Sequence, residues 1–310
     1  MSSQGISWTN TTWNPIVGCS KVSSGCDHCW AERMARLHYH DEFSNGWDGH
    51  VKLFPERLNQ PLHWRKPRKI AVGLMGDLWH PTVPNNYIAA VLGFAHTAKQ
   101  HTFQFLTKRA GRLPEFFAWF QEWTMGAWPR EYSHVQLGVS CECQEAADLR
   151  IPLLLQTPAA VRFVSCEPLL GPIKLTRHHA YCPSHDFDSG FCTGACPDRR
   201  YPDWIIVGGE SGPGARPMFF DWASTLLDQC KAASIPFHLK QWGEYAPSNY
   251  NGMYHFPISG CSEGCFPFQA HSDKTRLLNG GSCGAVHVGK KAAGRLLDGR
   301  EWLEFPEAKA

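Results

Sequence analysis

Residues 135–167 read V-Q-L-G-V-S-C-E-C-Q-E-A-A-D-L-R-I-P-L-L-L-Q-T-P-A-A-V-R-F-V-S-C-E. Two short apolar runs, 135–139 and 161–165, are typical of strands, and residues 145–156 between them have a helical pattern. A strand, a helix and a second strand in this order predict a parallel βαβ unit. Because both strands are almost continuously apolar, we expect a sheet that is covered on both faces.

The same pattern extends outward from this unit in both directions. Further strands are predicted at 70–75, 102–106, 204–207 and 236–240, and helices at 87–98, 111–123 and 221–233. Strands that alternate with helices along a chain favour an α/β fold with a parallel, TIM-barrel-like sheet, partial or complete.

Polar or small residues follow each predicted strand. They are Gly76 and Asp77, Lys108, Ser140 and Glu142, Glu167, Glu210, and Lys240 at the last strand end. In a parallel barrel the carboxyl ends of the strands meet at one mouth, where catalytic groups lie. Structural alternatives remain open: a helix N-cap for Asp77, a surface turn for Ser140 and Glu142, an ion pair of Glu167 with Lys108 or Arg109, and a buried ion pair for Lys240.

Three cysteines, Cys19, Cys26 and Cys29, occur in the run C-S-K-V-S-S-G-C-D-H-C near the start of the chain. A structural zinc site needs four closed ligands. A 4Fe-4S cluster held by three thiolates leaves one iron free to bind another molecule. The spacing alone leaves both possibilities open. A helix is predicted directly after the cysteines, at 30–40, with Ala31 and Leu37 on its apolar face.

Composition restricts the class of protein. The chain has 310 residues, of which 43% are hydrophobic and 19% charged, so it has enough apolar material for one large α/β domain or two smaller ones. A formal net charge of +2 is too balanced to indicate a nucleic-acid-binding protein by bulk charge, although residues 65–69 form a local basic run.

The N-terminus has no signal-peptide pattern, and no apolar stretch is long enough to span a membrane. Thirteen cysteines without a secretory signal predict a reducing, cytoplasmic location.

Two stretches, 176–202 and 247–285, interrupt the alternation and are predicted to be insertions in a single domain. The first contains Cys182, His185, Cys192 and Cys196. Two such pairs can close a tetrahedral zinc site. Alternatively, these cysteines join those of the second insertion around another cluster, or they are free thiols.

Eight motifs in order give the chain a resemblance to a known family. They are W-N-P-I-V-G-C-S-K-V-S-S-G-C-D-H-C-W-A-E, G-D-L-W-H, F-L-T-K-R, L-G-V-S-C-E, V-S-C-E-P-L-L-G-P-I, I-V-G-G-E-S-G-P-G-A-R-P-M, K-Q-W-G-E and V-G-K-K-A-A-G-R-L-L-D-G. The series, from about residue 6 to 306, resembles the phage Gp37/Gp68-like family of the radical S-adenosylmethionine (radical SAM) superfamily. A phage-encoded protein of this kind would act in the host cytoplasm.

The resemblance implies that Cys19, Cys26 and Cys29 hold a 4Fe-4S cluster whose free iron binds S-adenosylmethionine. A reducing electron donor would then be a partner. His28 takes the position of an aromatic residue that contacts the adenine. Gly76 and Asp77 match the segment that contacts the methionine end of the cofactor, and Lys108, Ser140 and Glu142 are further candidates. The first cysteine spacing, six intervening residues, is longer than the usual three.

Glu167, Glu210 and Lys240 are the candidate catalytic residues. The predicted substrate is a nucleic-acid base, specifically a thymine-derived base in phage DNA that undergoes hypermodification or rearrangement. Two alternatives stay open: a zinc-stabilised nucleic-acid-binding or interaction protein without radical chemistry, and an enzyme that acts on a peptide or protein.

Overall fold

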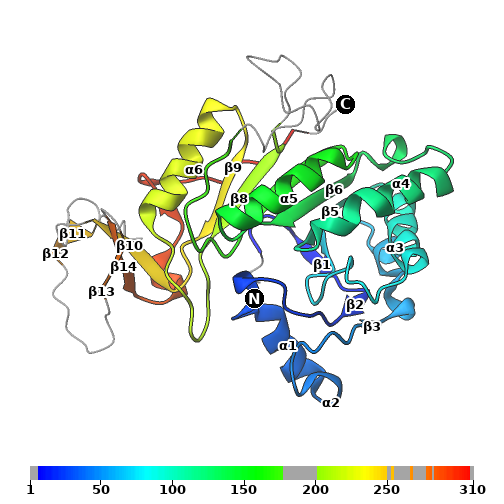
Figure 1. Cartoon of the computed structure of the whole chain (residues 1–310), viewed down its shortest axis with the longest axis horizontal. Coiled ribbons are helices and arrows are strands. Elements are labelled where there is room, and N and C mark those ends of the chain that lie inside the picture. The colour runs from blue at the N-terminus through cyan, green and yellow to red at the C-terminus, as the bar shows by residue number, and fades with distance from the viewer. Residues whose placement is uncertain are drawn as a thin grey trace.

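The structure is a computed structural model that describes residues 6–176, 201–249, 253–254, 266–267, 277–280 and 283–307. Its centre is a seven-stranded sheet in the order β1-β4-β5-β6-β7-β8-β9, in which every neighbouring pair is parallel. The strands are β1 (Thr11–Trp13), β4 (Lys69–Val72), β5 (Thr102–Thr107), β6 (Val135–Ser140), β7 (Val161–Cys166), β8 (Trp204–Gly208) and β9 (Phe237–Gln241). The sheet is curled into a half-barrel (Figure 1).

Four helices connect successive strands of the sheet and cover its outer face. They are α3 (Asn85–Thr97), α4 (Leu113–Trp123), α5 (Gln144–Gln156) and α6 (Phe220–Ala232). Alternate residues of a strand, such as Ile70 and Val72 of β4, pack with these helices in the largest apolar cluster. The intervening residue Ala71 belongs to a separate cluster on the inner face. The two-residue period of the strands therefore separates two cores.

The predicted parallel α/β architecture is confirmed as a half-barrel, and each of the six predicted strands overlaps an observed one. The first strand, β1, was missed because its sequence T-T-W lacks an apolar run. It is a strand because its residues pair with β4, where Thr11 is opposite Ile70 and Trp13 is opposite Val72.

Large side chains fill the inner face of the sheet, and Gly138 leaves the space that one of them occupies. A Cβ atom on Gly138 in β6 would lie 2.4 Å from the ring of Phe163 in β7. Trp8 and Trp204 pack in the same inner cluster. At the end of the sheet opposite the mouth, Ser7 Oγ lies 2.8 Å from Nε2 of His238. The chain segment before β1 therefore closes the bottom of the half-barrel against β9.

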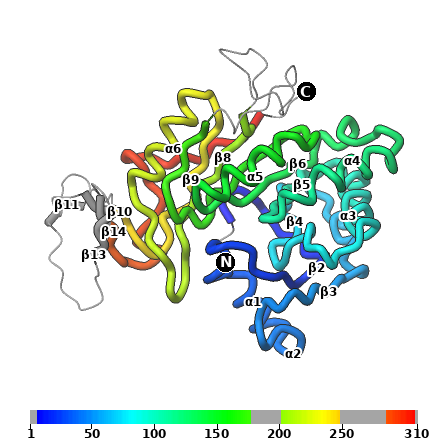
Figure 2. Tube along the Cα trace, in the orientation of Figure 1, coloured from blue at the N-terminus to red at the C-terminus, as the bar shows by residue number. Residues whose placement is uncertain are grey.

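The segment between β1 and β4 lies beside the sheet in both ribbon and tube views (Figures 1 and 2). It contains β2 (Ile16–Val17), α1 (Trp30–His38), α2 (His40–Phe43) and β3 (Lys52–Leu53). The prediction for the apolar face of α1 was wrong at one position, since Leu37 is 67% exposed. Glu32 is buried instead, because its carboxylate accepts a hydrogen bond from the Trp47 amide at 3.2 Å.

The C-terminal part adds small antiparallel sheets. Their strands are β10 (Tyr245–Asn249), β11 (Met253–Tyr254), β12 (Phe266–Pro267), β13 (Leu277–Gly280), β14 (Cys283–His287), β15 (Leu296–Leu297) and β16 (Arg300–Glu301), with α7 at Lys290–Ala293. Short 3-10 helices are η1 (Ser24–Cys26), η2 (Pro55–Arg57), η3 (Gln60–His63), η4 (Ala110–Arg112) and η5 (Arg130–Tyr132). Cys182, His185, Cys192 and Cys196 of the first predicted insertion lie outside the described residues.

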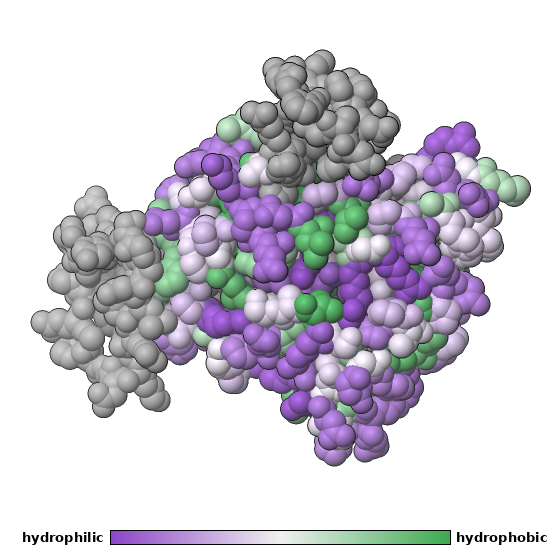
Figure 3. Space-filling view, in the orientation of Figure 1, coloured by the Kyte–Doolittle hydropathy of each residue, from purple (hydrophilic) through white to green (hydrophobic). Residues whose placement is uncertain are grey.

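Within the described ranges, no helix combines the length and hydropathy needed to cross a membrane. The visible surface of these ranges is mainly hydrophilic, with its hydrophobic residues in small groups (Figure 3). Such a surface fits a fold whose apolar strand faces are already covered.

Candidate active site

The three N-terminal cysteines lie on residues 18–29, here called the cysteine loop, at the carboxyl end of the first strands. Gly18 forms an isolated parallel bridge with Gly76, which continues the pairing direction of β1 and β4. A Cβ atom on Gly76 would lie 2.5 Å from the carbonyl oxygen of Gly18. Gly76 is thus needed for the close approach of two backbones, and this approach brings Cys19 to the same edge as Asp77.

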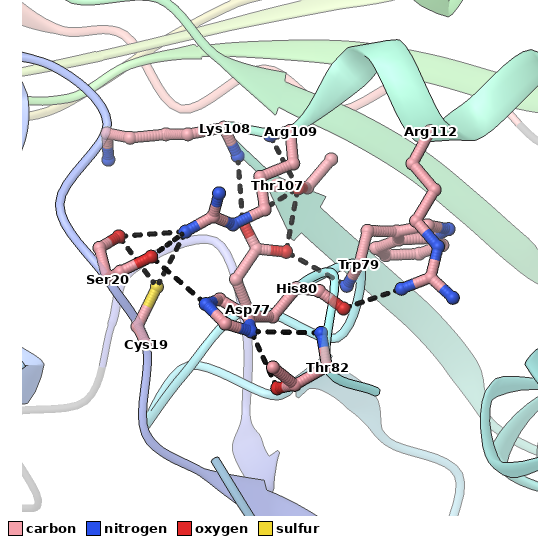
Figure 4. A network of polar contacts seen from close by, with 10 residues as sticks. All are labelled: Cys19, Ser20, Asp77, Trp79, His80, Thr82, Thr107, Lys108, Arg109 and Arg112. Atoms are coloured by element: carbon pink, nitrogen blue, oxygen red, sulfur yellow. Dashed lines mark hydrogen bonds and ion pairs between the residues drawn. The ribbon is translucent and has the colours of Figure 1, made fainter. Parts of the chain in front are cut away.

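Asp77 accepts several hydrogen bonds at the carboxyl ends of β4 and β5 (Figure 4). Its carboxylate accepts hydrogen bonds from the Thr107 hydroxyl at 2.7 and 2.8 Å, from the Trp79 amide at 3.0 Å and from the Lys108 amide at 3.2 Å. Asp77 does not cap helix α3, whose N-cap is Pro84. The N-cap alternative is therefore wrong, and Asp77 instead fixes the ends of β4 and β5 against each other.

Arg109 joins this edge to the cysteine loop. Its guanidinium donates to the Ser20 carbonyl at 2.9 Å and to the Ser20 hydroxyl at 2.8 Å, and one nitrogen lies 3.9 Å from Sγ of Cys19 (Figure 4). The Ser20 hydroxyl also lies 3.0 Å from Nε2 of His80. Burial lowers the pKa of His80, and the charge of Arg109 lowers it further. Ser20 and His80 lie in two of the motifs quoted above, but the sequence assigned them no role, because that role arises from contacts between distant segments.

The cysteine thiols differ in their surroundings. Cys26 is buried, whereas Cys19 and Cys29 are half-buried. Burial and the charge of Asp77 raise the pKa of Cys19 to about 11, although Arg109 opposes this shift. A thiolate at Cys19 therefore needs positive charge next to the sulfur beyond that of Arg109.

The three cysteines of the loop do not form a site for a single metal ion in the described structure. Among the described residues, no three His, Cys, Asp or Glu side chains come close enough to share one metal ion. In a cubane cluster each thiolate binds a different iron, so the three sulfurs stand farther apart than they do around one ion. The positive charge of Arg109, which lies 3.9 Å from Sγ of Cys19, favours the thiolate form of this cysteine.

A second polar network holds the loop from the opposite side. The carboxylate of Glu210, which follows β8, accepts a backbone hydrogen bond and side-chain hydrogen bonds from Arg216 at 2.8–3.0 Å. Nδ1 of His28 lies 3.0 Å from the same carboxylate. Burial alone would raise the pKa of Glu210, but hydrogen bonds from Arg216 and His28 lower it overall.

Arg216 extends this network into the cysteine loop itself. Its guanidinium donates to the Ser24 carbonyl at 2.8 Å and to the Asp27 carboxylate at 3.1 Å. Glu210 therefore orients an arginine and a histidine that both position residues between Cys19 and Cys29. The predicted catalytic role of Glu210 stays a prediction, and its observed contacts are those of a positioning residue.

Glu142 makes a third contact with the cysteine loop, at Gly25 in its middle. Glu142 is 1% exposed and forms an ion pair with Arg150 at 2.9 Å. A Cβ atom on Gly25 would lie 3.0 Å from the carboxyl carbon of Glu142. Burial would raise the pKa of Glu142, but the nearby Ser23 hydroxyl and the Arg150 charge lower it. The surface-turn alternative is wrong for Glu142 and for Ser140, which is also buried.

The two remaining candidate catalytic residues contact each other. Lys240 in β9 forms a short ion pair with Glu167, which follows β7. Gly208 lies between them in sheet order, and its Cβ position is 3.1 Å from the Glu167 carboxyl carbon. The alternative of a buried ion pair for Lys240 is confirmed as to the pair but not its burial, because Lys240 and Glu167 are both half-buried. Glu167 thus pairs with Lys240 rather than with Lys108 or Arg109.

Two cavities border the cysteine loop. The larger has a volume of about 660 Å³ and is lined by Val22 of the loop together with residues that follow β4 and β5. The smaller has a volume of about 240 Å³ and is lined by His28, Cys29 and Arg33 among others. The mouth therefore has room for small molecules on both sides of the cysteine residues.

Residues 3–306 match the sequence profile of one protein family, described as "Protein of unknown function (DUF5131)". The chain belongs to this family. The DUF5131 match includes the cysteine loop, every strand of the half-barrel and the strand-end residues, so the family description applies to the entire site. No curated protein and no solved structure matches the chain.

Proposed function

We propose that this DUF5131 protein is a radical SAM enzyme. The observation that carries the proposal is the position of the cysteine loop, which places three thiols at the carboxyl-end mouth of a parallel half-barrel. Active sites of parallel barrels lie at this end of the strands. Contacts from Arg109, Glu142 and Arg216 hold the loop in place from three sides.

In this proposal Cys19, Cys26 and Cys29 hold a 4Fe-4S cluster. When bound, the cluster supplies an electron that cleaves S-adenosylmethionine and yields the radical that abstracts hydrogen from substrate. The chain itself orients and shields the reactants. Arg109 contributes positive charge beside Cys19, and Arg216, oriented by Glu210, holds the Ser24 carbonyl and the Asp27 carboxylate on either side of Cys26.

The substrate that we propose is a thymine-derived base in DNA. A large cavity with a basic wall adjoins the cysteine loop, and phosphate-bearing substrates favour such surroundings. Chemistry on a base requires that the nucleotide be single-stranded or turned out of the duplex. Lys240 and Glu167, which face the same mouth, are the proposed residues for contact with the base.

The first test is anaerobic reconstitution with iron and sulfide, followed by dithionite and S-adenosylmethionine, with 5′-deoxyadenosine measured by mass spectrometry. We expect formation of 5′-deoxyadenosine that depends on iron. Cys26→Ala should abolish it while the circular dichroism spectrum stays native. Cys143→Ala, a half-buried cysteine outside the loop, is the matched control and should retain it.

A colourless protein with tightly bound zinc and no cofactor cleavage would contradict the proposal. That result would favour a zinc-stabilised binding or interaction protein. Retention of cofactor cleavage in Cys26→Ala would contradict the assignment of the ligands.

A further inference from the structure

The guanidinium of Arg109 lies between the carboxyl end of β5 and the cysteine loop (Figure 4). One of its nitrogens, Nη2, donates to the Ser20 carbonyl at 2.9 Å and to the Ser20 hydroxyl at 2.8 Å. The same nitrogen lies 3.9 Å from Sγ of Cys19. The Arg109 side chain is only 14% exposed, so salt and water screen its charge little. A single nitrogen therefore contacts both the residue beside Cys19 and the cysteine sulfur.

Asp77 is the carboxylate that pairs with Arg109, but its hydrogen bonds go elsewhere. Its Oδ2 lies 3.8 Å from Nε of Arg109, which is too far for a hydrogen bond, and Nε has no other acceptor in the described structure. The Asp77 oxygens accept instead from the Thr107 hydroxyl and from the amides of Trp79 and Lys108. The hydrogen bonds of the Arg109 guanidinium are therefore directed to the cysteine loop.

His80 holds the Ser20 hydroxyl from the other side. Nε2 of His80 lies 3.0 Å from this hydroxyl, and Nδ1 of the same ring lies 2.8 Å from the Thr82 hydroxyl. The His80 residue is 3% exposed, so packing and these two contacts fix its ring. The Ser20 hydroxyl is thus held between an imidazole and a guanidinium. This arrangement keeps the Arg109 guanidinium oriented toward Cys19.

Hydrogen bonds to sulfur and the charge around an iron–sulfur cluster are among the factors that set its reduction potential. Reduction adds one electron and so makes the cluster more negative. A cation and an N–H donor beside a thiolate therefore stabilise the reduced state more than the oxidised one. The free thiol shows the same preference: burial raises the pKa of Cys19, and the hydrogen bond and charge of Arg109 oppose that rise.

We propose that Arg109, oriented by Ser20 and His80, is a positioning residue that raises the reduction potential of the cluster through the Cys19 thiolate. The inference deepens the proposed function and rests on it for the presence of the cluster. The one-electron donor that this function requires passes one electron to the cluster, and Arg109 stabilises the negative charge that the electron adds. Arg109 thereby regulates how readily the cluster is reduced.

The test measures the reduction potential of the reconstituted cluster by anaerobic titration with dithionite and redox mediators, followed by electron paramagnetic resonance. Arg109→Gln should lower the ratio of reduced to oxidised cluster at a fixed potential by at least about tenfold, which corresponds to about 59 mV. Arg109→Lys keeps the charge but lacks the planar fork, so its shift should have the same sign and be smaller. An unchanged potential in Arg109→Gln, with full iron content, would overturn the proposal.

Arg130→Gln is the matched control. Arg130 is exposed in η5, which precedes β6, so the six residues of this strand, about 20 Å, separate it from the mouth. Salt screens an exposed charge over that distance, and the potential should stay at the wild-type value. An equal shift in Arg130→Gln and Arg109→Gln would show an effect of net charge alone and would overturn the proposal.

Two variants of Ser20 test the orientation of Arg109. Ser20→Ala removes the hydroxyl that joins Arg109 to His80, so it should lower the potential although no charge is lost. Ser20→Thr keeps the hydroxyl and should retain the wild-type potential. A wild-type potential in Ser20→Ala would overturn the proposal, and this result decides even where Arg109→Gln fails to hold iron.

These measurements separate the inference from the proposed function. A cluster whose potential depends on Arg109 but which does not cleave S-adenosylmethionine would contradict the proposed function and leave the inference in place. Cofactor cleavage by a protein whose potential is independent of Arg109 and Ser20 would do the reverse. A purified protein that assembles no cluster would overturn both.

Discussion

Nδ1 of His28 lies 3.0 Å from Oε2 of Glu210, although 182 positions separate the two residues in the chain. The same carboxylate holds Arg216, whose guanidinium also reaches Ser24 and Asp27. Through Arg216 and His28, one carboxylate at the end of β8 thus holds residues on both sides of Cys26. These contacts anchor the cysteine loop to the carboxyl end of the sheet.

Glu210→Gln should destabilise the protein by about 2–3 kcal/mol, because it replaces charge-assisted hydrogen bonds with neutral ones around a buried group. Urea unfolding monitored by tryptophan fluorescence measures the change. Asp228→Asn is the matched control, since Asp228 is 73% exposed and its ion pair with Lys231 spans 3.8 Å. The control should change the free energy by less than about 0.5 kcal/mol. Equal small effects in both variants would contradict the positioning role.

Arg150→Met should cost about 3–5 kcal/mol, because it leaves the carboxylate of Glu142 buried without a partner. The double variant Glu142→Gln/Arg150→Met should recover part of that loss, since it removes the unpaired charge. A double-mutant cycle from urea unfolding provides the coupling energy. Strictly additive effects would show that Glu142 and Arg150 of α5 do not stabilise each other.

Gly138→Ala should destabilise the protein by about 1–3 kcal/mol, since its Cβ would lie 2.4 Å from the Phe163 ring. Gly93→Ala in helix α3 is the opposite control, because nothing lies within 4 Å of its Cβ position. It should stabilise the protein by about 0.5–1 kcal/mol through helix propensity. Thermal unfolding distinguishes the two. A neutral Gly138→Ala would mean that the curl of the sheet does not depend on this position.

His238 should make folding sensitive to pH between about 6.5 and 4. Burial lowers its pKa to about 4, whereas the unfolded chain titrates near 6.5. In this window the unfolded state binds the additional proton, so the free energy of unfolding falls as the pH falls, by at most about 1.4 kcal/mol per pH unit. His238→Gln should flatten this slope in urea titrations at several pH values. The control His63→Gln, at an exposed position, should retain the slope.

The alternation of strands and helices was readable from sequence because buried strands need apolar runs and outer helices need a periodic apolar face. Segments 135–139 and 161–165 became β6 and β7 with shifts of one residue at one end. β1 could not be predicted in this way, because T-T-W is a strand only through its pairing with β4. The exposure of Leu37 and the burial of Glu32 on α1 have the same origin, since the amide of Trp47 reaches Glu32 across a turn of chain.

The sequence by itself determined the order of strands and helices, the three cysteines on one loop and the polar residues at the strand ends, because each depends on neighbours in the chain. Only the tertiary structure decided which of those polar residues meet. Glu210 with His28 and Glu167 with Lys240 are pairs across the mouth. The curl of the sheet sets the distances between its strand ends, and no local pattern in the sequence encodes that curl.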